Sequence, residues 1–185
     1  MDSVGKHPED KPRHVHPLVG KWLDPAVPRT GWVFCAMETT GDKHRICDMC
    51  QSTSVRHGHI LKHADVPDTL FVGLQCAERM EDNYHGPAKR QRWFEDDLKI
   101  ESGWSNRKWK VSLIGNYYLN VRGFNIAIWD KGGAGFGITI KLENRFDGEY
   151  VRNGKKLYTT LDEAKLGALT ALLFARKERR EDGLR

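Results

Sequence analysis

The chain contains few cysteines and no long apolar run, and each shortage excludes a class of protein. Its 185 residues include four cysteines, too few for the disulfide framework of a small secreted domain. The longest apolar stretch, residues 166–175, has about half the length of a bilayer-spanning helix and lies in an amphipathic pattern. The first residues lack the charged-then-apolar pattern of a secretory signal. We therefore predict a cytoplasmic protein that has no membrane role.

Acidic residues are missing from one long segment, residues 102–129. The whole chain is only mildly basic, with 30 lysines and arginines against 25 acidic residues and a net charge of +5. Basic side chains neutralise phosphates and aromatic rings stack on bases, so a nucleic-acid partner is favoured, although we expect about half of the rings to be sheet core. The interleaved basic and aromatic residues are Arg107, Lys108, Lys110 and Arg122 with Trp104, Trp109, Tyr117, Tyr118, Phe124 and Trp129.

Three cysteines and several histidines lie between residues 47 and 76. Cys47-Asp-Met-Cys50 places two thiolates on one tight turn, as a tetrahedral zinc site requires. Residues 55–63 and 70–76 predict the two strands of a hairpin, and a helical stretch opens at Cys76. This order of knuckle, hairpin and helix N-terminus is similar to a treble-clef zinc module. We therefore predict a structural Zn²⁺ ion.

We expect a histidine of the first hairpin strand to be the fourth ligand. With the hairpin centred near residues 66 and 67, His59 lies opposite Leu74 and His57 opposite Cys76, while His63 lies beside the turn. This geometry favours His59 or His57 over His63. The predicted metal ligands are Cys47, Cys50, His59 and Cys76, and the alternatives for the fourth position are His57, His63 and Cys35.

Cys35 is the cysteine outside this group. It would complete an all-cysteine site, but the strand-like residues 31–37 favour a buried thiol. A redox use of Cys47 and Cys50 requires a strand before the pair and a helix that opens on it. Residues 51–56 predict a turn into a strand instead, so the metal site is the favoured interpretation.

Composition and chain breaks predict an α+β protein in several parts. Residues 1–28 contain prolines and charges without periodicity and predict a flexible arm. Residues 29–85 form the zinc module. Gly86-Pro87 then begins a connector helix, residues 86–104. Residues 105–185 change to a period of two and end in an amphipathic pattern, which predicts an antiparallel sheet covered by a C-terminal helix.

Alternation along the chain predicts the register of a four-stranded meander. Phe124, Ile126 and Ile128 share one face of a strand, since side chains alternate strictly. Hairpin pairing across Arg122-Gly123, across residues 131–135 and across residues 114–116 then brings further apolar residues to that face. They are Tyr117, Leu119 and Val121, then Ile138, Ile140 and Leu142, and finally Trp109, Val111 and Leu113.

The last helix is predicted to cover this apolar face. Thr160 and Glu163 are spaced as a capping box at its start, and its apolar residues are Ala164, Leu166, Ala168, Leu169, Leu172 and Leu173. The opposite face of the sheet is polar, basic and aromatic, which suits contact with nucleic acid. It carries Lys108, Lys110, Ser112, Tyr118, Asn120, Asn125, Trp129, Thr139 and Lys141. The predicted nucleic-acid contacts are Arg107, Lys108, Lys110, Tyr118, Asn120, Arg122 and Lys141.

From Gly31 onward the chain resembles a family of uncharacterised bacterial and phage-borne proteins. The shared features are the CxxC knuckle, a hairpin with histidine, the segment Val72-Gly-Leu-Gln-Cys76-Ala, a basic linker and the motif Thr160-Leu-Asp-Glu-Ala-Lys165. In that family, which has no assigned activity, a second cysteine often stands where this chain has Leu74.

The C-terminal part also resembles another kind of domain. Strands followed by Tyr158-Thr-Thr-Leu-Asp-Glu-Ala-Lys165 are similar to the sheet and helix of Apetala-type and phage-integrase arm-binding domains. Those domains read DNA with an open sheet face. The resemblance thus implies DNA rather than RNA as the partner and assigns contacts to Lys108, Lys110, Tyr118 and Asn120.

Three classes of function fit these patterns. The favoured one is a non-enzymatic, zinc-containing nucleic-acid-binding protein. The second is a protein-interaction or inhibitor module of phage type, with Trp22, Trp32, Trp93 and Trp104 as interface anchors. The third is a metal-dependent nuclease of the His-Me finger type, with His59 or His63 as the base and Asn83 or His85 at a divalent ion. A zinc-bound His59 cannot also be that base.

Overall fold

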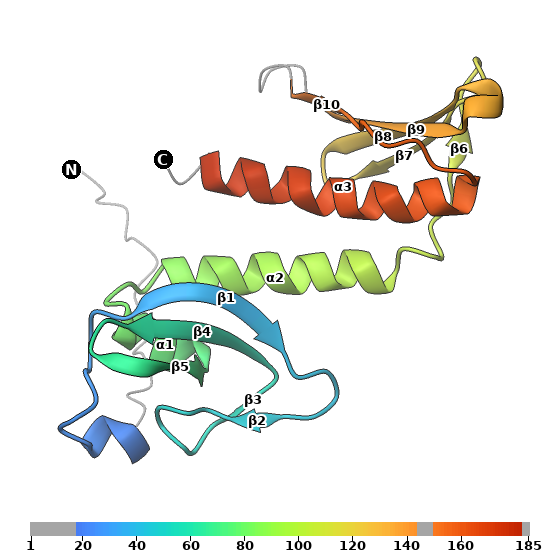
Figure 1. Ribbon diagram of the computed structural model, residues 1–185. Helices are drawn as coiled ribbons and strands as arrows, with labels where there is room; N and C mark the ends of the chain where they lie inside the picture. Colours follow the sequence, from blue (N-terminus) through green and yellow to red (C-terminus); the bar gives the residue numbers. More distant parts are fainter. Residues whose placement is uncertain (1–17, 144–149, 183–185) are drawn as a thin grey trace, which may run out of the picture. The chain divides into compact units, whose positions relative to one another are not determined.

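The computed structural model describes residues 18–143 and 150–182. These residues form antiparallel sheets and α-helices, which confirms the predicted α+β class. The elements in chain order (Figure 1) are η1 (Gly20–Leu23), β1 (Val33–Thr39), β2 (Arg45–Ile46), β3 (Ser54–Val55), β4 (His57–His63), β5 (Val66–Val72), α1 (Leu74–Met80), α2 (Gly86–Ser102), β6 (Lys110–Val111), β7 (Tyr117–Val121), β8 (Phe124–Asp130), η2 (Gly132–Ala134), β9 (Phe136–Leu142), β10 (Val151–Asn153) and α3 (Leu161–Asp182).

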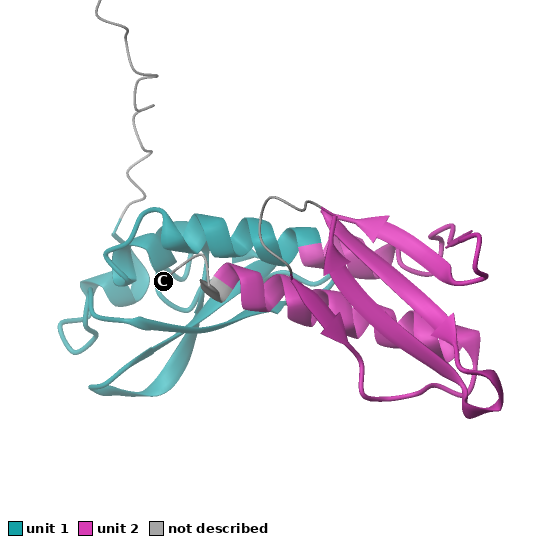
Figure 2. Ribbon diagram, turned by 90° about the horizontal axis from the view of Figure 1, so that it is seen from above, with its two compact units in different colours: residues 1–96 teal, residues 97–185 magenta. Residues whose placement is uncertain are grey.

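The chain divides into two compact units, Met1–Asp96 and Asp97–Arg185 (Figure 2). Each unit has its own cluster of buried apolar residues. The boundary falls inside α2, so the predicted connector helix belongs in part to each unit. None of the described helices is long and apolar enough to cross a membrane.

Unit 1 contains a sheet with the strand order β1-β4-β5 and a short ribbon of β2 and β3. In the hairpin of β4 and β5, His59 lies opposite Val72 and His63 opposite Val66. The turn is therefore at Ala64 and Asp65, and the prediction that centred it near residues 66 and 67 is wrong. Pro67 lies within β5, where it is tolerated because β5 is an edge strand.

Residues 18–28 differ from the predicted flexible arm, whose first part, residues 1–17, lies outside the described residues. Trp22 is buried in the core of unit 1, and the N–H of Lys21 donates to the carbonyl of Met49 at 2.8 Å. Gly20 has a φ of 65°, and a Cβ atom there would lie 2.7 Å from the carbonyl oxygen of Cys50. This segment therefore packs closely against the CxxC turn.

Unit 2 contains a sheet with the strand order β10-β9-β8-β7-β6. Ile126 lies opposite Leu119 on one side and Ile140 on the other, which confirms the predicted register of these strands. The turn of Arg122 and Gly123 has φ values of 53° and 79°, as a tight hairpin turn requires. Val111 lies opposite Tyr117, whereas the predicted loop of residues 114–116 would place Leu113 there, so the prediction for this strand is wrong by two residues. Val111 and Leu113 are both exposed rather than part of the apolar face.

Two features of unit 2 differ from the prediction. Strand β10 extends the sheet beyond the predicted four strands, by pairing with β9. Leu166 of α3 is exposed, whereas Ala164, Ala168 and Leu172 are buried against the sheet core. The capping box is confirmed, since Thr160 Oγ1 accepts the N–H of Glu163 at 3.2 Å and Glu163 Oε2 accepts the N–H of Thr160 at 3.3 Å.

Candidate metal centre and open sheet face

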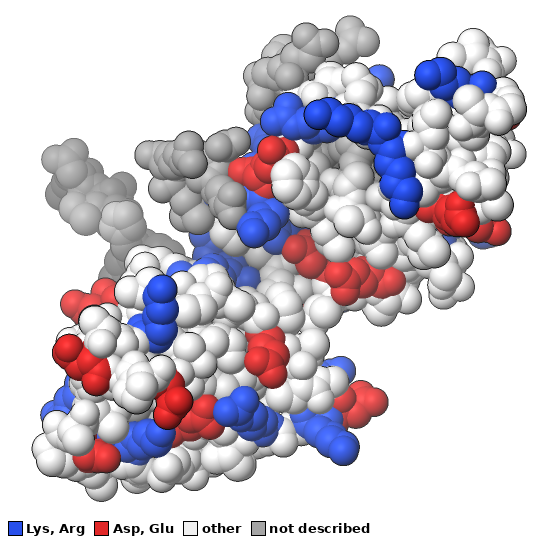
Figure 3. Space-filling model, in the orientation of Figure 1, with Lys and Arg blue, Asp and Glu red and all other residues white. Residues whose placement is uncertain are grey.

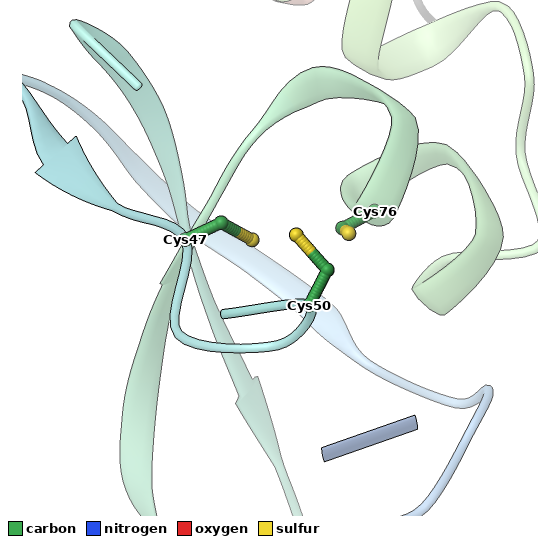
Figure 4. A group of neighbouring side chains, drawn as sticks. All are labelled: Cys47, Cys50 and Cys76. Atoms are coloured by element: carbon green, nitrogen blue, oxygen red, sulfur yellow. The ribbon is translucent and has the colours of Figure 1, made fainter. Parts of the chain in front are cut away.

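Three of the four predicted metal ligands come together in unit 1 (Figure 4). The sulfur atoms of Cys47, Cys50 and Cys76 all lie within 4.8 Å of one another, and all three residues are buried. Sulfur atoms bound to one tetrahedral zinc ion lie about 3.8 Å apart, given the usual zinc–sulfur distance. The group is thus compatible with a metal site after a small adjustment.

Backbone hydrogen bonds hold the CxxC turn against the hairpin. The N–H of Cys47 donates to the carbonyl of Thr53, and the N–H of Gln51 donates to the carbonyl of Cys47, both at 2.9 Å. Asp48 bonds twice to Phe71: its N–H donates to the carbonyl at 2.9 Å, and its carboxylate accepts the N–H at 2.7 Å. The third sulfur comes from the first turn of α1, two residues after Leu74. Two elements thus supply the three thiols.

Electrostatics prepares two of these thiols to bind a cation. A hydrogen bond from the Cys76 thiol lowers the pKa of Cys47 to about 5, although burial acts in the opposite direction. The same bond, together with burial, raises the pKa of Cys76. Burial alone would raise the pKa of Cys50, but hydrogen bonds from Ser52 and Thr53 bring it below its ordinary value. Because a metal binds the thiolate form, metal binding would release the proton that Cys47 and Cys76 share.

The structure does not bring the predicted His59 into this group. Among the described residues, no histidine has a ring nitrogen that lies within 4.8 Å of all three sulfur atoms. His59 is fully buried on β4, and burial and the charge of Arg90 lower its pKa to about 4. Gln91 acts in the opposite direction on the pKa, but neither ring nitrogen of His59 makes a hydrogen bond of good geometry within the described chain. A side chain so enclosed does not reach a substrate, which also removes it as a nuclease base.

The alternative fourth ligands lie in different places. Cys35 is exposed at a β-bulge of β1, so the expectation of a buried thiol is wrong. β1 is an edge strand, and a bulge there leaves its extra residue unpaired. The ring of His63 packs on Trp32, with a centroid distance of 5.4 Å. The ring of His57 packs on Phe94 of α2 at 5.9 Å.

A cavity of about 410 Å³ adjoins the three-cysteine group. Cys47 and Cys76 form part of its wall, and His57 and Gln91 contribute polar atoms. Nδ1 of His57 and Oε1 of Gln91 are buried without a hydrogen-bond partner within the described residues. Gln91 was not predicted as a site residue. The helical pattern of α2 shows which side chains face the core, but not which of them lie beside the hairpin of β4 and β5. The remaining residues of the wall are Thr53, Ser54, Val55, Arg56, Gly73, Leu74 and Gln75.

The predicted polar sheet face is assembled in unit 2. Strand register aligns two rows of side chains on the face opposite the core: Lys110, Tyr118, Ala127, Thr139 and Asn153 in one, and Asn120, Asn125, Lys141 and Val151 in the other. Asn125 donates to Asn120 Oδ1 at 2.7 Å, and the hydroxyl of Thr139 donates to Asn153 Oδ1 at 2.8 Å. Asn120 and Lys141 are exposed, and Tyr118 is half-buried. We call the side chains of these two rows, with Trp129, the open face.

Helix packing leaves this face uncovered in unit 2. Figure 1 shows α3 along one face of the sheet only, and its buried residues join the core on that side. Ile100 and Trp104, at and after the end of α2, belong to the same core. Trp129 lies flat over Gly137, where a Cβ atom would meet its ring at 2.2 Å, and its indole N–H donates to Thr139 at 3.2 Å.

The other predicted nucleic-acid contacts lie at the edges of the open face or away from it. The guanidinium of Arg107 stacks on the ring of Trp104, 5.6 Å from its centroid. Lys108 is exposed before β6, and Arg122 is exposed at the turn between β7 and β8. Basic side chains also gather over β10 and the segment after it (Figure 3). This group contains Arg152, Lys155 and Lys156, which are not among the predicted nucleic-acid contacts.

Comparison with protein-family models, with curated proteins and with solved structures finds no match for this chain. The two resemblances drawn from short motifs therefore stay predictions.

Proposed function

We propose that this protein is a zinc-containing nucleic-acid-binding protein that acts without catalysis. Cys47, Cys50 and Cys76 bind the zinc ion, which stabilises unit 1 in a treble-clef-like arrangement of knuckle, hairpin and helix. The open face of unit 2 contacts the phosphates and bases of DNA. We also propose that the protein acts in the cytoplasm.

The observation that carries the proposal is the composition of the open face. A solvated sheet face does not require aromatic side chains, yet Tyr118 lies beside Lys110 on this face and Trp129 lies on it opposite Gly137. The lysines suit phosphate oxygens, and the rings suit stacking on bases. Asn120 and Asn125 add amide groups that can bond to base edges. The face thus offers all three kinds of contact on one surface.

The test is a binding titration of fluorescently labelled DNA by anisotropy over a range of salt concentrations. Reversing both charges in K110E/K141E should weaken binding and reduce the slope of log K against log salt by about 2, because each lost phosphate contact removes about 0.9 from that slope. RNA of the same sequence is titrated in parallel, and weaker binding to RNA is expected.

The control variant K165E/K177E makes the same change of charge on α3, which covers the opposite face of the sheet. It should bind almost as the wild type does, since the variant loses only nonspecific attraction by net charge and the ion pair between Lys165 and Asp162 on the surface of α3. Equal weakening in both variants would show that total charge rather than the open face governs binding. No binding of the wild type at low salt would refute the nucleic-acid partner and favour a protein partner.

A further inference from the structure

The cavity beside the three-cysteine group is larger than one water molecule requires. Its volume is about 410 Å³, within the range of small-molecule sites, whereas one water occupies about 30 Å³ in the liquid. Cys47 and Cys76 lie on its wall next to Leu74, the first residue of α1. Within the described residues, no carboxylate or additional thiol joins the three sulfur atoms within 4.8 Å.

Two polar atoms on the same wall lack hydrogen-bond partners among the described residues. Nδ1 of His57 and Oε1 of Gln91 are buried without a hydrogen bond in the described part of the chain. Buried polar atoms are almost always paired in folded proteins. A ligand in the cavity would supply such partners. Arg56 also lines the cavity, and its side chain is 55% exposed. Its guanidinium lies 3.9 Å from the exposed carboxylate of Asp42 and has further N–H donors for a negative group of that ligand.

The chemistry of the sulfur group restricts the class of ligand. A zinc ion with three protein ligands retains one coordination position, which an outside molecule can take. Thiolates are soft donors that zinc sites readily accept, and a carboxylate matches the fork of an arginine side chain. A small molecule with both groups would satisfy the metal and Arg56 together.

We propose that this cavity binds a small thiol that also carries a carboxylate. The thiol coordinates the zinc as a thiolate, releases its proton to solvent and replaces a water molecule on the metal. Its carboxylate pairs with Arg56. The inference deepens the proposed zinc site and rests on it.

The experiment uses the full-length protein with Co²⁺ in place of zinc, because thiolate-to-cobalt charge-transfer absorption reports the number of bound thiolates. Mercaptoacetate should increase this absorption in a saturable way. Acetate, which has no thiol, should leave it unchanged, and 2-mercaptoethanol, which has no carboxylate, should bind about two- to fivefold more weakly, as expected for loss of one exposed ion pair. The variant R56Q should bind both thiols equally.

The variant L74C provides a matched control, since position 74 lies on the cavity wall beside two of the sulfur atoms. A fourth protein thiolate there should give the higher absorption without added thiol and abolish the response to mercaptoacetate. If L74C does not fold, intact mass spectrometry of the zinc-loaded wild type replaces it as the test. An adduct of one mercaptoacetate supports the proposal, and absence of the adduct at saturating mercaptoacetate refutes it.

Two results would overturn the proposal. One is a wild-type spectrum that mercaptoacetate leaves unchanged. The other is a changed starting spectrum in H57A or H59A, which would show that a histidine already occupies the fourth position. Failure of the wild type to bind Co²⁺ at all would instead refute the metal site itself, so the two proposals fail in different ways.

Discussion

Cys47 and Cys76 lie far apart in the sequence, but their sulfur atoms lie within 4.8 Å of each other in unit 1, with a hydrogen bond between the two side chains. The bond lowers the pKa of Cys47 to about 5 and raises that of Cys76. One residue lies in the CxxC turn and the other in α1, and both belong to the core of unit 1 with Trp22 and Met80. Occupation of the sulfur group by a metal would therefore stabilise the whole of this core.

Removal of the metal should destabilise unit 1 and leave unit 2 folded. Free zinc at a thousandfold its dissociation constant stabilises a folded site by about 4 kcal/mol, and unit 2 has a separate core. Hydrogen exchange with and without a chelator should show faster exchange throughout unit 1, including β4, β5 and α1, and unchanged exchange in unit 2. The variant C76S should reproduce this pattern without a chelator. Equal loss of protection in both units, or in neither, would contradict the prediction.

Replacing His59 with leucine should retain metal binding and alter the pH dependence of stability. His59 is fully buried, and its pKa is lowered from 6.5 to about 4 by burial and by Arg90. As the pH falls, His59 takes up a proton near pH 6.5 in the unfolded chain but only near pH 4 in the folded chain. The wild type should therefore lose about 3 kcal/mol of stability as the pH falls through that interval.

The measurement is urea unfolding of the wild type and H59L between pH 7 and pH 4. The free energy of unfolding of H59L should not show the decrease that protonation of His59 causes. Protonation of the three cysteines should affect both proteins alike. Metal content is measured on the same samples. A tenfold or greater loss of zinc affinity in H59L would identify His59 as a ligand and contradict its assignment to the core.

The sheet of unit 2 was predictable because three signals agreed. Strict alternation, the Arg122-Gly123 turn and the capping box of Thr160 each restrict the register or the boundary of an element, and none of them permits a shift by one residue. Strand β10 gave no such signal. It has three residues with exposed side chains, and its pairing with β9 depends on backbone bonds that any sequence can make.

The candidate metal site was predictable only in part. The spacing of Cys47 and Cys50 and the position of Cys76 at a helix start are local features, and these three residues do come together. The fourth position depended on the register of one hairpin, and the turn at Ala64 and Asp65 contains no glycine that would mark it. A shift of that turn moved His59 from opposite Leu74 to opposite Val72. Hairpin register is thus the point at which sequence reasoning failed.

Substitution of Gly58 by alanine should destabilise unit 1. A Cβ atom at this position would lie 2.3 Å from the ring of Phe71, which is 1% exposed and has no room to move away. Overpacking of this kind costs about 1–3 kcal/mol. Gly133 is a suitable control, because nothing lies within 4 Å of its added Cβ atom. G58A and G133A are compared by thermal unfolding, and equal midpoints would show that β4 accommodates the methyl group.

Substitution of Thr160 by alanine should destabilise unit 2. The hydroxyl oxygen of Thr160 accepts the N–H of Glu163 at 3.2 Å and satisfies a donor that has no partner inside α3. Loss of such a cap costs about 1 kcal/mol, which corresponds to a decrease of about 5 °C in the unfolding midpoint of a domain of this size.

Thr159 is the matched control for this substitution. It precedes the cap, and its backbone N–H rather than its hydroxyl bonds to Glu163, at 3.1 Å. T159A should therefore retain the wild-type midpoint. Hydrogen exchange should locate the effect of T160A in the first turn of α3 and in the strands beneath it, with unit 1 unchanged.

Because the chelator and G58A act on the other core, the effects of T160A and chelator treatment on the free energy of unfolding should be additive within about 0.5 kcal/mol. Coupling larger than that would show that the two cores unfold together.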